Sequence, residues 1–169
     1  MIEYRDLYDK DRNLTGKAIK KGDPIPEGLY IIVVLVFIEN SEGKFLIQRR
    51  SRKYKDGKLG TTGGHVKTGT TSIEGIMEEV EEEIGLKTSP SDYTLYYSGQ
   101  TNDVFFDDYY MKLDVDLSTL VLDELEVDEV CWMTPEEIYA AVASGDFLAE
   151  DVEEFDRLLE WKKAQESLS

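Results

Sequence analysis

A run of apolar residues at positions 30–38 constrains the fold of this chain more than any other feature of its sequence. The run is too short to cross a bilayer, and its β-branched residues favour a strand over a helix. Because polar residues do not alternate with the apolar ones, we expect a strand over residues 29–39 that is buried on both faces. Such a strand needs a sheet that is covered on each side.

Predicted strands and helices follow one another along the rest of the chain. A hairpin is expected over residues 3–20 with a polar turn at 9–13, and residues 52–64 are expected to form a basic loop that contains glycine. Further strands are expected over residues 45–50, 94–98, 103–115 and 126–132. Helices are expected after Thr71 and Thr134, which each begin a capping box, and over residues 149–165.

This order of elements predicts an α/β protein in which a mixed β-sheet is covered by helices on both faces. No internal repeat or low-complexity tract divides the chain. A length of 169 residues suits a single domain over residues 1–169, with a hairpin extension at 1–28 and C-terminal helices at 134–166.

The net charge of −17 argues against a general affinity for nucleic acids or for anionic membrane surfaces. The charge is uneven, because residues 1–69 sum to +5 and residues 70–169 to −22. A basic segment before an acidic one would suit an anionic substrate that holds a cation, although the same asymmetry also arises by chance. The start of the chain is unlike a signal peptide and Cys131 is a single cysteine, so we expect a cytoplasmic protein.

Six glutamates and no basic residue lie between positions 72 and 86, in a helix that Gly85 is expected to end. Like charges three or four residues apart each cost a helix roughly 0.2–0.5 kcal/mol. An ordinary solvated face would intersperse basic residues, and this helix does not. The six are Glu74, Glu78, Glu79, Glu81, Glu82 and Glu83.

Helix geometry sorts these glutamates into two groups, at about 100° per residue. Three of them lie on a plausible solvent face. Glu79, Glu82 and Glu83 form a separate cluster, and Glu83 lies about 20° from the edge of the apolar stripe. Carboxylates crowded at a partly buried margin either raise their pKa or gain a cation, for which Mg²⁺ is suited. The simpler interpretation is an acidic surface helix.

The segment at residues 64–86 resembles the Nudix box. That pattern is Gly, five residues, Glu, seven residues, Arg-Glu, an apolar residue, any residue, Glu-Glu, any residue, Gly and an apolar residue. The matching positions are Gly64, Glu79, Val80, Glu82, Glu83, Gly85 and Leu86. The strand before the box and the segment at 129–137 after it are also similar to the family, so the resemblance covers most of the chain.

Two positions of the box depart from the family pattern, because Thr70 replaces the glutamate and Glu78 replaces the arginine. In the family these two residues are generally regarded as an ion pair that braces the loop against the helix. Loss of both partners is more tolerable than loss of one, which would leave its partner unpaired, and the hydroxyl groups of Thr70 and Thr71 can brace the turn instead. The loss of this ion pair would be expected to reduce the rigidity of the loop, the affinity for metal and the activity.

The resemblance implies a Nudix-type α/β/α sandwich that hydrolyses a phosphoanhydride bond. Its substrate would be a nucleoside diphosphate linked to another moiety, or a related organic diphosphate. Glu79, Glu82 and Glu83 would bind Mg²⁺ or Mn²⁺. Glu79 and Glu83 would be the catalytic residues, with Glu79 the preferred general base. The candidates to hold phosphate oxygens are Arg50, Gly63 and Gly64.

Other residues have less specific interpretations. Glu126 and Glu129 are candidates for a further metal-binding carboxylate, although such strand-edge residues are commonly structural. His65 is expected in a loop where it can touch phosphate, and Cys131 is expected in the core rather than as a nucleophile. The aromatic residues between 93 and 110 can stack a nucleobase, but aromatic residues favour strands in any case.

Two other functions stay open at this point. The first half of the chain also resembles Nudix relatives near isopentenyl-diphosphate isomerase, but residues 59–65 lack the cysteine that such an enzyme needs. A Nudix-derived module that binds a nucleotide or metabolite without cleaving it is favoured by Thr70 and Glu78 and disfavoured by the retained glutamates. Spacing rules do not give the organic part of the substrate or the phosphorus attacked, and a homodimer is plausible.

Overall fold

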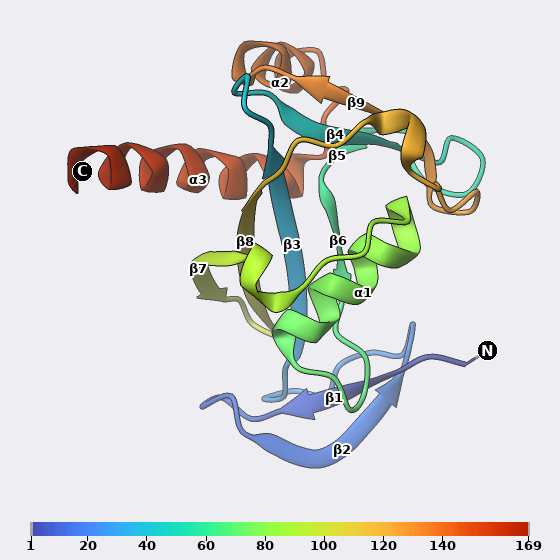
Figure 1. The fold of residues 1–169 in the computed structure, drawn as a ribbon. Helices are drawn as coiled ribbons and strands as arrows, with labels where there is room; N and C mark the ends of the chain where they lie inside the picture. The colour runs from blue at the N-terminus through green and yellow to red at the C-terminus, as the bar shows by residue number, and fades with distance from the viewer. Residues whose placement is uncertain (1, 169) are drawn as a thin grey trace.

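A computed structural model describes residues 2–168 of the chain, and Figure 1 shows their arrangement. In chain order the elements are β1 (Tyr4–Tyr8), β2 (Leu14–Lys20), β3 (Ile31–Glu39), β4 (Phe45–Arg50), β5 (Leu59–Gly60), β6 (Thr62–His65), α1 (Ser72–Ile84), η1 (Pro90–Asp92), β7 (Thr94–Gln100), β8 (Val104–Lys112), η2 (Leu117–Thr119), β9 (Val127–Met133), α2 (Pro135–Ala143) and α3 (Ala149–Leu168).

The main sheet is mixed and has β3 at its centre. Strand β3 pairs in parallel with β8 over its whole length and antiparallel with β6, and it meets β4 at Glu39. The pairs β7–β8, β4–β9 and β4–β5 are antiparallel. The predicted mixed sheet is therefore confirmed, and its central strand is the apolar run at residues 30–38.

Strand β3 packs into a separate hydrophobic cluster on each face of the sheet. Ile32, Val34 and Val36 pack beneath α1, whose buried side chains include Ile76 and Val80. On the other face β3 contributes to a cluster with residues of α2 and α3, including Phe37, Phe155 and Leu158. Figure 1 shows α1 in front of the sheet and α3 behind it. The prediction of helices on both faces is confirmed.

Helix α1 begins and ends where its sequence signals place it. The Thr71 hydroxyl accepts a hydrogen bond from the Glu74 amide at 3.3 Å, and the Glu74 carboxylate accepts one from the Thr71 amide at 3.0 Å. Gly85 ends the helix in the left-handed conformation, with φ of 69°. Thr134 caps α2 through a capping box of the same kind. The caps at Thr71 and Gly85 fix where α1 begins and ends, and so the position of each of its glutamates.

The predicted loop at residues 52–64 is wrong at its C-terminal end, which forms β5 and β6. Glycines usually weaken a strand, but here they allow two strands to lie close together. A Cβ at Gly63 would stand 2.5 Å from the Val34 carbonyl oxygen and 3.0 Å from the Leu35 Cβ. The glycine pair therefore belongs to the sheet beside β3 rather than to a loop.

The β1–β2 hairpin forms a small second sheet below the main one in Figure 1, as the sequence predicts. Its first strand is attached to the loop before α1, because the Thr68 amide donates to the Tyr4 carbonyl oxygen at 2.9 Å. The Gly69 amide donates to the Asp6 carboxylate at 3.0 Å. Within residues 2–168, no helix is long and apolar enough to cross a membrane.

Candidate active site

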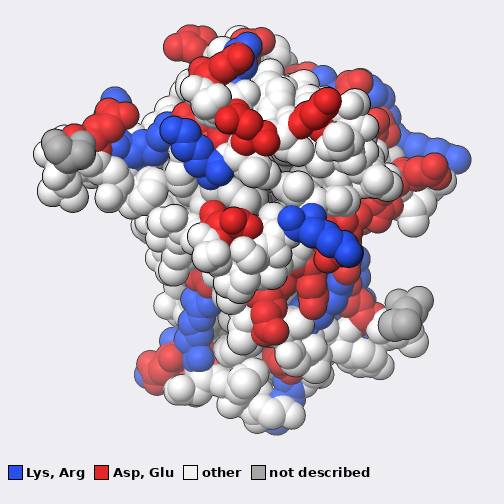
Figure 2. All heavy atoms as spheres, viewed as in Figure 1, with Lys and Arg blue, Asp and Glu red and all other residues white. Residues whose placement is uncertain are grey.

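A cleft of 480 Å³ lies beside α1 and β6, and it gathers the six residues that the resemblance assigns to the metal, to catalysis and to phosphate. The two glycines come from β6, the arginine from the end of β4 and the three glutamates from α1. The nominated residues that line the cleft are Glu79, Glu82, Glu83, Arg50, Gly63 and Gly64. Figure 2 shows acidic side chains gathered over the face of the molecule that α1 presents, with basic side chains at their border.

The carboxyl group of Glu79 lies directly over Gly64. A Cβ at residue 64 would stand 2.6 Å from Glu79 Oε1 and 2.7 Å from Oε2, distances that real Cβ atoms do not adopt. Glycine is therefore required at position 64 for the Glu79 side chain to reach its place against β6. This contact gives a physical reason for the spacing between the glycine and this glutamate in the box.

Glu79, which is half-buried, and Glu83, which is buried, form a carboxyl pair on consecutive turns of α1. Burial raises the pKa of both groups, and the Glu83 charge raises that of Glu79 further. Gln48 of β4 donates from Nε2 to Glu83 Oε1 at 2.9 Å, and Thr62 donates to Gln48 Oε1 at 3.0 Å. Glu83 Oε2 is buried and has no hydrogen-bond partner among the described residues.

Glu82, the third glutamate of the predicted cluster, is exposed and turned toward Lys67. Lys67 Nζ lies 2.5 Å from Glu82 Oε1 and 4.0 Å from Glu78 Oε2. Lys67 therefore bridges the loop before α1 to the helix, with its charge opposite to that of Glu78. The Thr70 hydroxyl donates to the Lys67 carbonyl oxygen at 2.5 Å, so the two departures from the box meet at this lysine.

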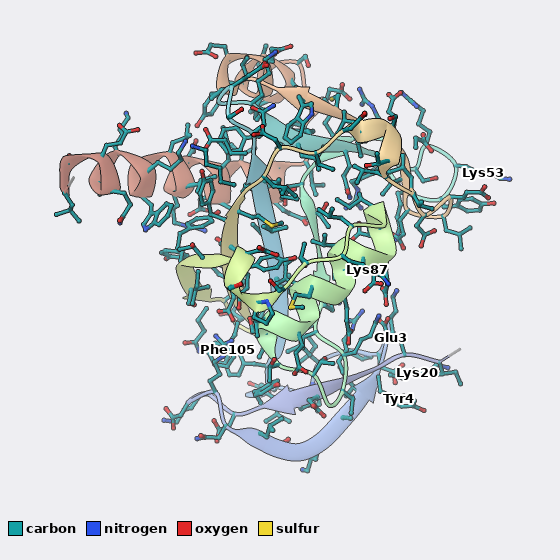
Figure 3. All side chains as sticks on the ribbon, in the orientation of Figure 1. Glu3, Tyr4, Lys20, Lys53, Lys87 and Phe105 are labelled. Atoms are coloured by element: carbon teal, nitrogen blue, oxygen red, sulfur yellow. The ribbon has the colours of Figure 1, made fainter. Side chains whose placement is uncertain are left out.

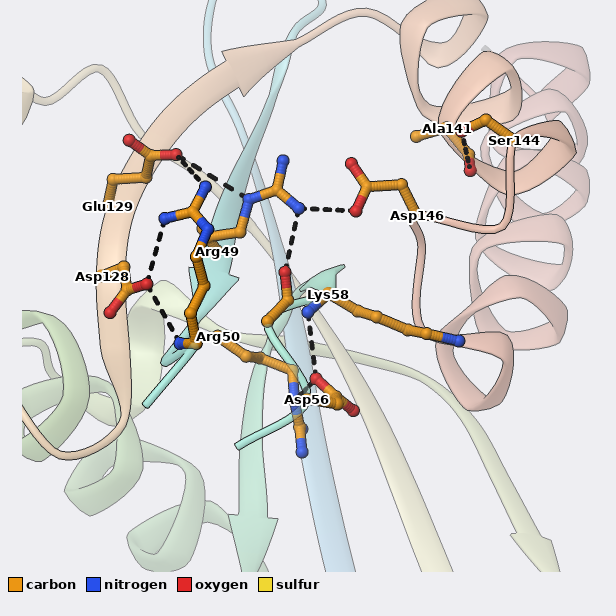
Figure 4. A network of polar contacts seen from close by, with 11 residues as sticks. Arg49, Arg50, Asp56, Lys58, Asp128, Glu129, Ala141, Ser144 and Asp146 are labelled. Atoms are coloured by element: carbon orange, nitrogen blue, oxygen red, sulfur yellow. Dashed lines mark hydrogen bonds and ion pairs between the residues drawn. The ribbon is translucent and has the colours of Figure 1, made fainter. Parts of the chain in front are cut away.

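The two neighbouring arginines of β4 have different surroundings, which Figure 4 shows. Arg50 lines the cleft, and its Nε donates to the Asp56 carboxylate at 2.9 Å. Arg49 points elsewhere and binds Asp146 at 2.6 Å and the Gly57 carbonyl oxygen at 2.9 Å. Because successive residues of a strand point to opposite faces, only Arg50 is available to a substrate in the cleft.

Glu126 and Glu129, the two candidate carboxylates from outside the box, also have different surroundings. Glu126 lines the cleft, where its charge raises the pKa of Glu83 and its carboxylate lies 3.3 Å from Lys55 Nζ. Glu129 lies instead beside Arg49 and Arg52, at 3.8 Å and 3.5 Å. Of the two candidates from outside the box, only Glu126 stands where it can act.

Several residues of the cleft have no motif that would have revealed them. Among them only Gln48 could have been noticed in the sequence, because it is a polar residue directly after the apolar segment Phe45, Leu46 and Ile47. Lys55 also lines the cleft. Arg5 and Lys21 reach it from the hairpin, which is far from the box in sequence.

Cys131 packs against the core, as the sequence predicts, whereas the prediction of a loop at His65 is wrong because His65 is the last residue of β6. Burial lowers the pKa of His65 to about 4, and the charges of Arg5 and Lys21 lower it further, so this imidazole is neutral at the edge of the cleft. Cys131 packs against the cluster beneath α2 and α3. Burial raises the pKa of its thiol, which disfavours a role as a nucleophile.

The buried part of the site fits a hard divalent cation. Two neighbouring carboxyl groups and an unpartnered Glu83 oxygen form an oxygen-rich cradle that one cation would satisfy. Within residues 2–168, no three His, Cys, Asp or Glu side chains converge on one point, because Glu82 is turned to Lys67. The Glu79–Glu83 pair is the part of the predicted ligand set that the structure brings together.

Comparisons with known proteins agree with the fold and the glutamate helix. The model of the NUDIX domain family matches residues 29–157. An uncharacterized Nudix hydrolase of Listeria monocytogenes is 34% identical, and the match covers 87% of this chain and 89% of that one. The Nudix hydrolase YfcD of Escherichia coli K12 is 33% identical, with 82% and 77% covered. The crystal structure of DR0079 from Deinococcus radiodurans superposes with a TM-score of 0.74 at 26% identity, covering 92% of this chain and 98% of that one.

The chain belongs to the Nudix family. It is a hydrolase that acts on acid anhydrides, and the Nudix-type sandwich expected from its sequence is the fold that it adopts. The family generally uses divalent metal cations, which agrees with the oxygen-rich cradle at Glu79 and Glu83.

Proposed function

We propose that this protein is a metal-dependent hydrolase that cleaves the phosphoanhydride bond of a nucleoside diphosphate linked to another moiety, or of a related organic diphosphate. The observation that supports the proposal is the Glu79–Glu83 carboxyl pair beside Gly64, at the floor of a cleft whose walls carry Arg50 and Lys55. Carboxylates for a cation and basic groups for phosphate lie within one cavity.

Glu79, Glu82 and Glu83 would hold Mg²⁺ or Mn²⁺, with Glu82 exchanging its contact with Lys67 for the cation. The bound cation supplies Lewis acidity and offsets negative charge that develops on the phosphoryl oxygens. Gln48 fixes the orientation of Glu83, and Gly64 fixes that of Glu79. Glu79 accepts a proton from the attacking water while the water oxygen bonds to phosphorus and the bridging P–O bond breaks. Arg50 holds a phosphoryl oxygen.

A second cavity of 560 Å³ offers a place for the organic part of the substrate. It shares the β3 residues Val33, Val34 and Leu35 with the first cleft, so the two cavities adjoin at β3. Tyr97 and Phe106 line it with ring centroids 5.8 Å apart, and the Arg157 guanidinium lies 4.1 Å from the Tyr97 ring centroid. Such a surface suits a planar group that stacks on it.

The isomerase and the binding module are less well supported. Cys131 packs against the α2 and α3 cluster, and His65 is the only histidine in the sequence. An isomerase of the prenyl diphosphate kind would need a cysteine and several histidines in the cleft. A module that only binds would not require the Glu79–Glu83 pair, whose charge repulsion is a cost without a cation.

The test is to incubate the protein with Mg²⁺ or Mn²⁺ and nucleoside diphosphate derivatives, dinucleoside polyphosphates or prenyl diphosphates, and to analyse the products. We expect metal-dependent cleavage that Glu82→Gln reduces about a hundredfold, or ~2.7 kcal/mol of transition-state stabilisation. Glu81→Gln is the matched control, because Glu81 is exposed on the same helix and lies outside the cleft. It should retain full activity.

Each rival has a distinct outcome in the same experiment. Binding of panel compounds without cleavage would favour the binding module. A shift of a double bond without release of phosphate would favour the isomerase. Equal losses in Glu82→Gln and Glu81→Gln would contradict the assignment of Glu82.

A further inference from the structure

The β1–β2 hairpin lies outside the segment that matches the family model, yet it forms part of the cleft. It is attached to the loop before α1 by the hydrogen bonds of Tyr4 and Asp6. It is also attached to the main sheet, because the backbones of Tyr8 and Tyr30 exchange two hydrogen bonds of 2.8 and 2.9 Å. The hairpin is therefore a fixed wall of the cleft.

Strand alternation in the hairpin points one set of side chains into the cleft. Tyr4 and Lys20 are register partners, and both are exposed on the outer face of the hairpin (Figure 3). Arg5 and Glu3 therefore face inward, and Glu3 lies in Figure 3 between the hairpin and the helix. Arg5 is 8% exposed, and its buried Nε has no hydrogen-bond partner among the described residues.

Three cations surround the Glu3 carboxylate without forming a hydrogen bond to it. Arg5 Nη2 lies 4.0 Å from Glu3 Oε2, Lys21 Nζ lies 3.9 Å from the same atom, and Lys67 Nζ lies 3.8 Å from Oε1. The charge of Arg5 also acts on Glu79, which places this group of cations beside the carboxyl pair. Arg5, Lys21 and Lys67 are called the hairpin cation group below.

Lys67 also pairs with Glu82 and Glu78, but the charges of Arg5 and Lys21 share Glu3 at distances too long for a hydrogen bond. A buried guanidinium with an unpartnered Nε is costly unless a ligand completes its hydrogen bonds. A terminal phosphoryl group carries about two negative charges and three acceptor oxygens at neutral pH, and arginine binds it through paired N–H groups. A phosphoryl group esterified on both sides carries less charge and needs room for a second organic group where the hairpin stands.

We propose that the hairpin cation group binds the unesterified terminal phosphoryl group of the substrate, next to Glu79. This inference rests on the proposed function and narrows its substrate class to organic diphosphates that end in a free phosphate. Diphosphates esterified at both ends are poorer substrates. Glu3 acts as a weak internal competitor that holds the three cations together and moves aside when the phosphoryl group binds.

The first experiment measures binding by calorimetry with methylenediphosphonate, whose P–C–P bridge cannot be hydrolysed, in the presence of Mg²⁺. We expect Arg5→Gln to weaken its affinity about tenfold to a hundredfold, because a hydrogen-bonded charge is lost. Glu3→Gln should tighten binding about twofold to fivefold, because it removes the competing charge. Lys20→Gln, on the outer face of the same hairpin, is the control and should bind like the unaltered protein.

Lys21→Gln repeats the test if Arg5→Gln does not fold, because Lys21 is exposed and its replacement leaves the core intact. A general loss of structure would weaken binding in both the Arg5 and Glu3 variants, whereas the proposal requires opposite signs. Unchanged affinity in Arg5→Gln and Lys21→Gln, or weaker binding in Glu3→Gln, would overturn it.

The second experiment compares hydrolysis of nucleoside 5′-diphosphates with that of nucleoside diphosphate sugars that carry the same base. We expect higher kcat/KM for the free diphosphates, and Arg5→Gln should reduce that preference. Cleavage that depends on Glu82 but is equal for both substrates, in the unaltered protein and in Arg5→Gln, overturns this inference and leaves the proposed function standing. Binding of methylenediphosphonate that depends on Arg5, without hydrolysis of any diphosphate, supports the anion site and contradicts the proposed function.

Discussion

The carboxyl group of Glu79 rests on the backbone of Gly64, so closely that any side chain at position 64 would displace it. The α-carbon on β6 and the carboxyl group on α1 thus define each other's position across the floor of the cleft. Because Gly64 has no Cβ, α1 can pack against β6 closely enough for the Glu79 carboxyl group to reach the strand backbone.

Gly64→Ala should therefore reduce kcat at least about a hundredfold, because a displacement of about 1 Å in a catalytic group costs that much. The measurement is steady-state kinetics, with circular dichroism to verify the fold. Gly63→Ala is the comparison for stability, because its Cβ would stand 2.5 Å from the Val34 carbonyl oxygen, so this variant should lower the melting temperature of the protein. Equal activity in Gly64→Ala and the unaltered protein would contradict the contact.

Arg49 and Arg50 are adjacent residues of β4 with separate roles (Figure 4). Arg50→Gln should lower kcat/KM about tenfold to a hundredfold, mostly through a higher KM, because it removes a charged hydrogen bond to phosphate. Arg49→Gln should leave kcat/KM within about twofold and lower the free energy of unfolding by about 1 kcal/mol, because Asp146 is partly exposed. Kinetics and urea unfolding of both variants test this pair. A reversal of the two phenotypes would show that the arginines are assigned to the wrong faces.

The sequence predicts the parts of the site that depend on local geometry. Helix periodicity and the Thr71 and Gly85 signals place Glu79 and Glu83 at the margin of the core, and in the structure the two carboxyl groups are close enough for each to shift the pKa of the other. Periodicity also groups Glu82 with them, but a contact with Lys67 across the preceding loop turns Glu82 away. Such a contact depends on the path of the loop, which helix spacing does not describe.

Tertiary contacts decide the remaining features. Gly63 and Gly64 predict a loop by their local preferences, yet the close approach of β3 makes them part of a strand. Arg5 and Lys21 carry no motif, and they reach the cleft only because the hairpin attaches to the loop before α1. Residues that meet through long-range packing leave no periodic pattern in the sequence.

Addition of a divalent cation should stabilise the protein against thermal unfolding. A cation that binds only the folded state contributes about 2.7 kcal/mol when its concentration is a hundred times its Kd. Mg²⁺ or Mn²⁺ should raise the melting temperature, and a chelator should reverse the shift. Glu79→Gln should abolish most of the shift, whereas Glu81→Gln should retain it because Glu81 is exposed outside the cleft. A shift that persists in Glu79→Gln would place the cation elsewhere.

The stability of the metal-free protein should fall as the pH rises, because burial raises the pKa of Glu79 and of Glu83 in the folded state. The folded protein then holds a proton that the unfolded chain has released, so protonation favours folding. The stabilisation is complete below the ordinary glutamate pKa of 4.5 and is lost as the pH rises through the raised values. Each unit of difference in pKa contributes about 1.4 kcal/mol.

Glu79→Gln isolates this contribution, because glutamine preserves the shape of the side chain without its charge. Asp108 and Asp151 are also buried with raised pKa values, but they are present in both proteins and cancel in the comparison. We expect the free energy of unfolding in a chelator to decline less steeply with pH in Glu79→Gln than in the unaltered protein. A divalent cation should reduce the decline in the unaltered protein, because it favours the ionised carboxylates. Parallel pH profiles for the two proteins in chelator would mean that Glu79 is already ionised in the folded state, and that the site does not hold the proton that a cation would displace.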